Sequence, residues 1–333
     1  MNVDENVDGT PMHVVELWFS DGSLVVQAEK SLFRVSGAVL AARSSVFNDM
    51  LGIAQPADTE TIDGCPMVRL PDSAEDVTCF FRAIFDSSFF EPYPCKVSFG
   101  NALSIARLSH KYSVDYLLRR ALVHLSYEFP TTLSAFDKWP DMCSTDFREV
   151  KHGLSPYVAV VQLARQVNAP WMLPLAFYKL ASADGKIIQK VLRCKVFKKH
   201  AARLEDNDKL VFLTCSILLA GLESKAVSFL HSSDKCASSK KCNTARLSAL
   251  TQVQNSVEEA VGPDPLDVGL NADVWDILEE GCSNLGQASR NLWTASSTSF
   301  LMEYILSLVP TMALREGKDG FRCELDTGKG GYC

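Results

Sequence analysis

Residues 33–51 read Phe33-Arg-Val-Ser-Gly-Ala-Val-Leu-Ala-Ala-Arg-Ser-Ser-Val-Phe-Asn-Asp-Met-Leu51, and this stretch decides the fold of the N-terminal half of the chain. In it, apolar side chains recur at spacings of three and four residues, which places them on one helical face: Val35, Ala38, Val39, Ala42, Val46, Phe47, Met50 and Leu51. Ser44 and Ser45 interrupt that face. The pattern predicts two short helices whose apolar side another element must cover.

The segment before this stretch supplies two predicted strands. Residues 14–19 and 24–28 are β-branched and aromatic runs, separated by Ser20-Asp21-Gly22-Ser23. An Asp-Gly pair between two such runs predicts a β-hairpin, because Gly adopts a positive φ without cost and Asp tolerates it. A hairpin alone is only marginally stable, so we expect the helices of residues 33–51 to cover it.

The segment after this stretch continues with alternating elements. Residues 68–70 form a third short strand in this interpretation, and residues 74–85 follow as a helix with one apolar face. Two prolines exclude helix from the loop 87–94. Apolar residues at helical spacing from 102 to 125, with a break near Ser113, predict a helical hairpin.

The second half of the chain has helical patterns without strand alternation. The expected helices cover residues 157–167, 170–183, 185–203, 206–230, 243–260 and 271–308. We therefore predict an α+β N-terminal domain, a small sheet covered by helices, followed by an all-α C-terminal domain. The predicted divisions are a disordered tail (1–12), the α+β domain (13–127), a linker (128–156), the helical domain (157–310) and a flexible tail (311–333).

Composition narrows the classes of function. The chain has 333 residues and a formal net charge of -7, so no general attraction to nucleic acid or anionic lipid is expected. The acidic, polar N-terminus lacks the features of a secretory signal, which predicts an intracellular protein in the cytoplasm, the nucleus or both. Its 11 cysteines are then expected to be mostly buried free thiols. The most apolar run, 211–222, is too short to span a bilayer.

Motifs of enzymatic chemistry are absent from the sequence. It contains no phosphate-binding loop, no Gly-x-Gly-x-x-Gly opening a helix, no His-Glu-x-x-His, no Gly-x-Ser-x-Gly and no Cys-x-x-Cys. We therefore predict a protein that is not an enzyme and carries no cofactor.

Two further patterns each leave an alternative open. His231, Cys236, Cys242 and Cys282 could form a zinc site, although structural zinc sites usually have closely spaced cysteine pairs, and clustered thiols are the alternative. A basic stretch within residues 186–203 could be a nuclear-targeting or nucleic-acid patch, but a solvated helix face is favoured because the whole chain is acidic.

Specific motifs give the chain a resemblance to a known family. Residues 19–26 and 33–51 resemble the core signature of the BTB/POZ domain, and residues 102–118 resemble its closing helices, where an Ala, a Lys-Tyr pair and a Leu recur in the same register. Residues 163–178 are similar to the helical region that follows this domain in a group of fungal BTB proteins. The resemblance implies a protein–protein interaction module that forms a homodimer.

The resemblance also implies where such a dimer would form. The candidates in the first strand and helices are Val15, Leu17, Phe19, Phe33, Val35 and Val39, with Asp21 near an acidic position of the interface. Some of these residues are expected to pack in the core instead, because successive residues of a strand point to opposite faces of the sheet. Ser36 and Gly37 replace the His-Arg or His-Lys pair that is usual in the family, so the charged groove of transcription-repressor BTB dimers is not expected.

A loop tripeptide connects the resemblance to a second partner. Phe89, Phe90 and Glu91 have the hydrophobic-x-acid spacing by which BTB adaptors contact a cullin, although adjacent phenylalanines often fold back onto the core. Two functions follow as alternatives. One is an adaptor that brings an unknown protein client to a cullin-type ubiquitin ligase; the other is a dimeric scaffold or transcription-associated regulator without ligase contact.

Overall fold

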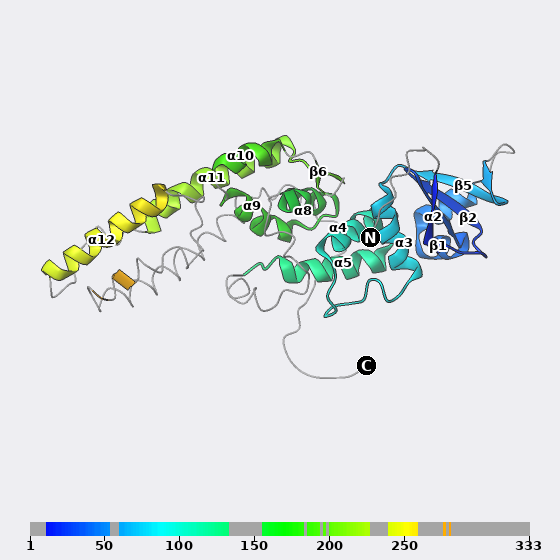
Figure 1. Cartoon of the computed structure of the whole chain (residues 1–333), viewed down its shortest axis with the longest axis horizontal. Coiled ribbons are helices and arrows are strands. Elements are labelled where there is room, and N and C mark those ends of the chain that lie inside the picture. The colour runs from blue at the N-terminus through cyan, green and yellow to red at the C-terminus, as the bar shows by residue number, and fades with distance from the viewer. Residues whose placement is uncertain are drawn as a thin grey trace, which may run out of the picture.

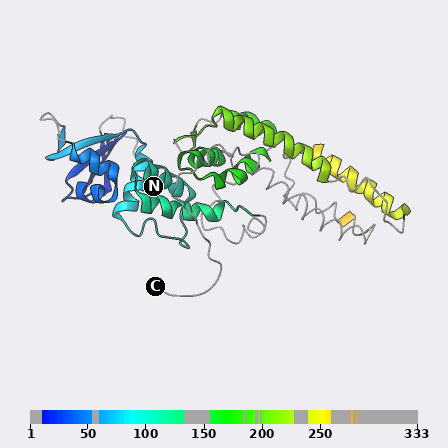
Figure 2. The same ribbon diagram turned by 180° about the vertical axis from the view of Figure 1, so that it is seen from behind.

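The computed structural model describes residues 11–53, 60–132, 155–182, 185–193, 196–197, 200–226, 239–258, 276–277 and 280. These residues form a mixed α/β structure that is elongated (Figure 1). A curled sheet lies at one end of the long axis, with helices α8 to α10 in the middle and α12 at the far end. Figure 2 gives the same arrangement from behind.

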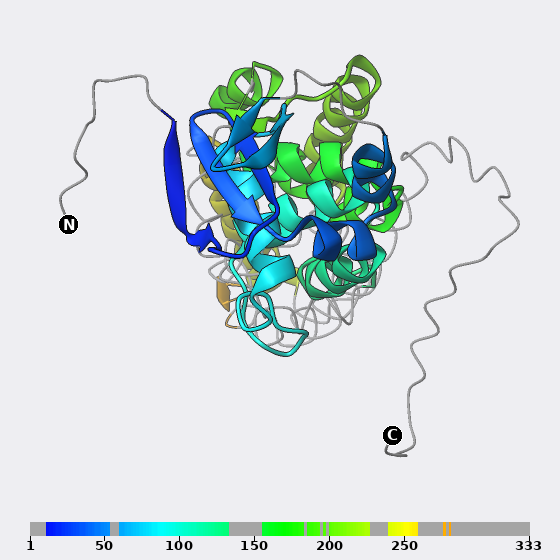
Figure 3. The same ribbon diagram turned by 90° about the vertical axis from the view of Figure 1, so that its right-hand side faces the viewer.

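The N-terminal half contains a five-stranded sheet and five helices among its described residues. The strands are β1 (Met12–Trp18), β2 (Leu24–Ala28), β3 (Ser31–Val35), β4 (Thr61–Ile62) and β5 (Cys65–Leu70). The helices are α1 (Gly37–Arg43), α2 (Ser45–Gly52), α3 (Ala74–Phe85), α4 (Phe99–Lys111) and α5 (Asp115–Glu128). The order in the sheet is β1-β3-β2-β5-β4, so β1 and β4 are its edges (Figure 3).

The hairpin expected around Asp21-Gly22 does not form. Strand β1 runs parallel to β3, which lies between β1 and β2 in the sheet. The Asp-Gly segment instead wraps the end of β3: Phe19 N donates to Arg34 O at 2.9 Å, and Ser23 N donates to Val35 O at 3.1 Å. Gly22 lies so close to β3 that an added Cβ would be 2.8 Å from Arg34 Cγ. The turn therefore requires glycine for close approach rather than for a hairpin.

The actual hairpin joins β2 to β3. These strands pair antiparallel from Leu24–Val35 to Ala28–Ser31, which leaves Glu29 and Lys30 as the connection. Glu29 has a φ of +50°, a region that glycine and asparagine usually occupy. Because neither residue type stands here, the sequence carried no signal of this turn.

The two faces of the sheet bury different apolar side chains, because successive residues of a strand point to opposite faces. Leu24, Val26 and Phe33 belong to the main core with α3 and α4. Val25 and Leu32 belong to a small second cluster with Cys65 and Met67, against which Trp18 and Ile62 pack: this cluster lies on the other face.

The helices predicted in the N-terminal half are confirmed, except that Val35, expected on a helical face, ends strand β3, and α1 begins at Gly37. Ser44 separates α1 from α2: its hydroxyl accepts from Phe47 N at 3.0 Å and donates to Tyr112 O at 2.5 Å. Ser73 caps α3 by accepting from Asp76 N at 3.2 Å. Ser113, with a φ of +53°, lies at the expected break between α4 and α5. These serines and the apolar spacing are local signals, which is why they were readable in the sequence.

The C-terminal half is mainly helical in its described residues. Its elements are α8 (Ser155–Gln166), the 3-10 turn η2 (Pro170–Met172), α9 (Leu173–Ala181), α10 (Gly185–Leu192), α11 (Asp206–Ala226) and α12 (Ser239–Glu258). The helix expected over 185–203 is wrong beyond Leu192. There β6 (Val196–Phe197) pairs antiparallel with β7 (His200–Ala201), so this half is not all-α and the basic stretch is not one helix face. Val196 and Phe197 are the β-branched and aromatic types that favour strands.

The two halves share a single hydrophobic core. Its buried residues run from Leu17 in β1 to Leu219 in α11, and α4 packs against α8. Among the described residues, no helix combines the length and apolar character needed to cross a membrane.

Candidate functional site

The structure divides the candidate dimer residues into two groups. Leu17, Phe33 and Val35 are at most 1% exposed and belong to the core, and Phe19 is half-buried against it. The others face solvent: Val15 is 86% exposed, Val39 is 38% exposed, and Asp21 is also exposed. The residues of the first group therefore pack in the core. Of the candidate dimer residues, only Val15, Val39 and Asp21 are exposed where a partner could bind.

Further apolar side chains are exposed on the same elements. Met12 on β1 is 60% exposed, and Val46 and Ile53 at the two ends of α2 are 36% and 68% exposed. Strand β1 is also a sheet edge, and an edge strand offers unpaired backbone groups to another chain. Ser36 and Gly37 add no cation here: Gly37 is buried, and its amide donates to Ser23 Oγ at 3.1 Å.

The loop that contains Phe89, Phe90 and Glu91 is attached to α3 and α5. Phe90 is buried, and Arg120 donates to its carbonyl oxygen at 2.6 Å. The Phe89 ring is half-buried with the Arg82 guanidinium carbon 4.1 Å from its centre. Of the three residues only Glu91 is exposed, so it is the group that a partner could reach directly.

A buried histidine supports this loop from α5. His124 Nε2 lies 2.9 Å from Glu91 O, and the ring contacts those of Phe90 and Tyr93. Burial lowers the pKa of His124, and the nearby Arg120 charge acts in the same direction. The neutral ring can donate its Nε2 proton to the carbonyl, which fixes the loop backbone.

Of the candidate metal set, only Cys242 lies within the described residues. It is buried in α12, while His231, Cys236 and Cys282 lie outside them. Among the described residues, no group of three His, Cys, Asp or Glu side chains is arranged to hold a metal. Buried free thiols are present, as in Cys215, whose pKa burial raises to about 11.

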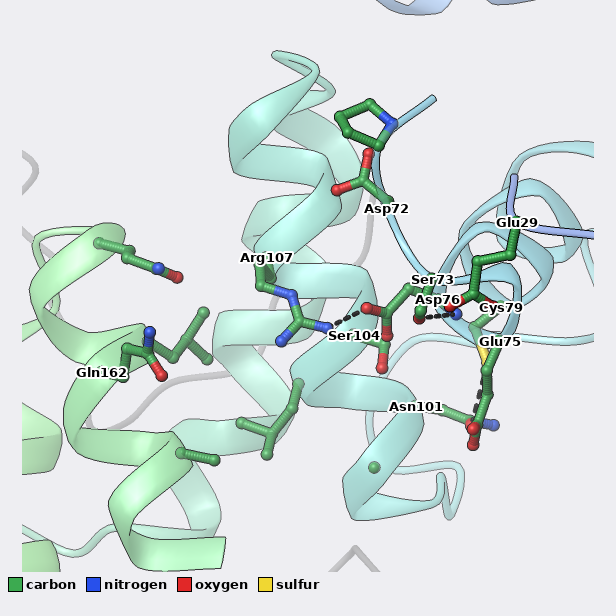
Figure 4. A pocket seen from close by; sticks show the side chains of 16 residues that line it. Glu29, Asp72, Ser73, Glu75, Asp76, Cys79, Asn101, Ser104, Arg107 and Gln162 are labelled. Carbon is green, nitrogen blue, oxygen red and sulfur yellow. Dashed lines mark hydrogen bonds and ion pairs between the residues drawn. The ribbon is translucent and has the colours of Figure 1, made fainter. Parts of the chain in front are cut away.

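A polar pocket that the sequence did not indicate lies where the two halves meet. It has a volume of about 400 Å³ and is enclosed by the start of α3, by α4 and by α8 (Figure 4). The β2–β3 turn contributes Glu29, and α8 contributes Gln162 and Gln166. Its lining thus comes from segments more than 130 residues apart. No local pattern could have brought these residues together.

Two ion pairs stabilise the walls of this pocket. Arg107 of α4 pairs with Asp76 of α3, which is 3% exposed. Asp72 accepts from Lys111 Nζ at 2.7 and 2.8 Å and from the Tyr112 hydroxyl at 2.5 Å. Burial and the Asp72 carboxylate raise the pKa of Tyr112 far above its usual range. Two of the pocket's carboxylates are therefore neutralised by partners of opposite charge.

Helix α11 has apolar side chains on two opposite faces. Phe212, Cys215 and Leu219 are buried toward the core, where α11 packs on α9. On the other side, Leu210, Leu213 and Ile217 are 65%, 37% and 73% exposed, at helical spacing. We call these three residues the α11 stripe. A stripe of this kind is typical of a helix that meets a partner.

No protein-family model, no curated protein and no solved structure matches this chain. The BTB/POZ relationship therefore stays a prediction from motifs.

Proposed function

We propose that this chain is a protein-interaction module without catalytic activity, which forms a homodimer through β1 and the first two helices of a BTB/POZ-like N-terminal domain. The observation that carries the proposal is the exposed apolar edge strand. Met12 and Val15 are 60% and 86% exposed on a strand whose outer edge pairs with no other strand described here. Exposed apolar groups beside open backbone groups favour addition of a second chain.

The order of the elements supports the BTB/POZ part of the proposal. Strand β1 and the β2–β3 hairpin are followed by the two short helices α1 and α2, the strands β4 and β5, the helix α3 and the helical pair α4 and α5. The paired short helices, the following helix and the closing helical pair occur in the order that the resemblance of residues 33–51 and 102–118 implies, although the hairpin joins β2 to β3 and not β1 to β2. Val39, Val46 and Ile53 add exposed apolar surface on α1 and at the ends of α2, in the elements expected to meet the partner.

The mass of the full-length chain in solution tests the dimer. Light scattering after gel filtration should give twice the 36.7 kDa of one chain at micromolar concentration. Val15→Asp should return the mass to that of one chain, because full burial of a valine is worth about 1.5–3 kcal/mol and an aspartate would have to be desolvated in its place. Ile217→Asp is the matched control, since Ile217 is similarly exposed but lies on α11. A wild-type chain that is monomeric, or a dimer that Val15→Asp leaves intact, contradicts the proposal.

The adaptor function is proposed within this framework, with a protein client and a cullin as partners. The α11 stripe supports a client surface on the helical half, and exposed Glu91 supports a cullin contact. Glu91→Lys should abolish co-purification with a cullin, and it leaves the packed Phe89 and Phe90 unchanged. Asp86→Asn is a control because Asp86 is an exposed carboxylate in the same loop. Absence of any cullin from the wild-type purification would favour the alternative, a dimeric scaffold or transcription-associated regulator.

The cell compartment separates these alternatives further. Both need an intracellular protein, in the cytoplasm, the nucleus or both. A transcription-associated regulator must reach the nucleus, and the basic residues of 195–203 are its candidate signal. Replacing the lysines there with glutamine and following the tagged protein by microscopy would distinguish a nuclear regulator from a protein whose location does not depend on this segment.

A further inference from the structure

The polar pocket between the two halves carries an unbalanced negative charge. Four carboxylates line it, those of Glu29, Asp72, Glu75 and Asp76. Arg107 pairs with Asp76, and Lys111 pairs with Asp72. For Glu29 and Glu75, no cationic partner is found in the described part of the chain. These two carboxylates thus have no ion-pair partner among the described residues, although Glu29 accepts a hydrogen bond from the Ala74 amide and Glu75 lies in the first turn of α3.

The state of the α3 N-terminus disfavours an anion as the occupant. Helix N-termini bind anions through free amide groups. Here the amide of Ala74 donates to Glu29 Oε2 at 3.1 Å, and the amide of Asp76 donates to Ser73 Oγ at 3.2 Å. Two of the amides at this helix end are therefore already bonded within the protein, and an anion would also meet the four carboxylates of the pocket.

One hydroxyl that lines the pocket forms no hydrogen bond within the described residues. Ser104 of α4 is only 6% exposed and lines the pocket, yet none of these residues forms a hydrogen bond with its hydroxyl. Its oxygen is not one of the fully buried atoms without a partner, so it is open to the pocket, where a ligand donor can take the place of water. On the opposite wall, the Gln162 side chain of α8 lies across from Arg107 and Ser104 (Figure 4).

The pocket also has an apolar part that suits an aliphatic chain. Leu103 of α4 and Leu163 of α8 line it, together with Ala159. Basic side chains and polyamines combine an apolar stem with a charged end that donates hydrogen bonds. The volume of about 400 Å³ is within the range of sites for small ligands.

We propose that this pocket binds an organic cation, with its ammonium or guanidinium group near Glu75 and Ser104 and its stem against Leu103 and Leu163. The cation is either the end of a Lys or Arg side chain from a partner polypeptide or a free polyamine. Both have the same chemistry, and the experiment separates the two sources. The site does not depend on the proposed dimer, because all of its lining comes from one chain.

Binding is measured on the full-length chain by titration calorimetry with three probes. They are a blocked pentapeptide Gly-Gly-Arg-Gly-Gly, the same peptide with citrulline in place of arginine, and spermidine. Arginine and citrulline have nearly the same shape but differ in charge, so we expect the arginine peptide to bind at least about tenfold more tightly. Tighter binding of the arginine peptide identifies a polypeptide partner, and tighter binding of spermidine identifies a polyamine; either supports the proposal.

Two substitutions locate the binding. Ser104→Ala removes only the unpartnered hydroxyl and should weaken the better probe about tenfold, the usual effect of losing one hydrogen bond to a charged group. Glu75→Gln should weaken it about threefold, because Glu75 is exposed. Glu60→Gln is the charge-matched control: its carboxylate is exposed and pairs with Arg69 outside the pocket. Thermal unfolding of each variant checks that it is folded.

Three results would overturn the proposal. They are equal binding of the arginine and citrulline peptides, equal weakening by Glu60→Gln and Glu75→Gln, and no binding of either cation at millimolar concentration. The first result would show that binding does not depend on the charge of the probe. The second would show that the probe is attracted by exposed carboxylates in general and not by this pocket. The last would show that the pocket is not a cation site.

Discussion

The turn at Gly22 allows the unexpected topology of the sheet to be tested in solution. An added Cβ at Gly22 would lie 2.8 Å from Arg34 Cγ, 2.9 Å from Arg34 C and 3.0 Å from Arg34 O. Two of these three atoms belong to the backbone of β3, which cannot move without disturbing its pairing with β2. We therefore expect Gly22→Ala to destabilise the protein by about 1–3 kcal/mol, the usual cost of overpacking.

Two other glycines separate this cause from the general effects of replacing glycine. Gly52 has no neighbour within 4 Å of an added Cβ and lies at the end of α2, so Gly52→Ala should be neutral or stabilise by up to about 1 kcal/mol. Gly64 is equally open but has a φ of +74°, so Gly64→Ala should cost about 1–2 kcal/mol through backbone strain alone.

Urea unfolding followed by tryptophan fluorescence measures all three free-energy changes. Hydrogen exchange gives a local readout, and Gly22→Ala should accelerate exchange of the Phe19 and Ser23 amides that bond to β3. A change below about 0.5 kcal/mol for Gly22→Ala would refute the close approach of the turn to β3. A loss of the same size for Gly52→Ala would refute steric contact as the cause.

Three further outcomes follow from buried groups. Burial lowers the pKa of His124 in the folded chain, so the unfolded chain binds more protons below about pH 6.5, and stability should fall as the pH drops below that value. Urea midpoints from about pH 8 to pH 5 should show a smaller fall in His124→Gln. Arg107→Gln should cost about 1–3 kcal/mol by leaving the Asp76 carboxylate buried, and adding Asp76→Asn should recover part of this loss in a double-mutant cycle. Maleimide should modify exposed Cys95 long before buried Cys215 in the native protein, as measured by peptide mass spectrometry, and equal rates would contradict the burial of Cys215.

Local signals explain which parts of the fold were predictable. The apolar spacing in residues 33–51 and the serine at position 44 specify α1 and α2 within one short stretch, and α3 follows the same logic with its cap at Ser73. The Asp21-Gly22 pair led to a wrong prediction of a hairpin, because the same dipeptide also occurs where the backbone passes close to a neighbouring strand. Which of these occurs depends on β3, a strand that comes later in the chain.

The candidate surfaces show the same division between local and distant causes. Alternation along β1 predicts that some candidates are buried, but it could not tell that Leu17 belongs to the core and that Val15 is open, because a bulge lies between His13 and Trp18. The pocket depends on α8 meeting α4, a contact between helices that are more than 40 residues apart in the chain. Sequence periodicity identifies each helix but not its neighbour.

The packing of α8 on α4 also bears on how the proposed functions combine. Because buried residues of both halves form one core, the helical half is held against the N-terminal half rather than attached only by the intervening chain. Strand β1 and helix α11 lie on different parts of the long axis (Figure 1). A second copy bound at β1 would therefore leave the α11 stripe of each chain open. If the α11 stripe binds a client as proposed, such a dimer would carry two client sites, and two linked sites bind a repeated partner more tightly than one.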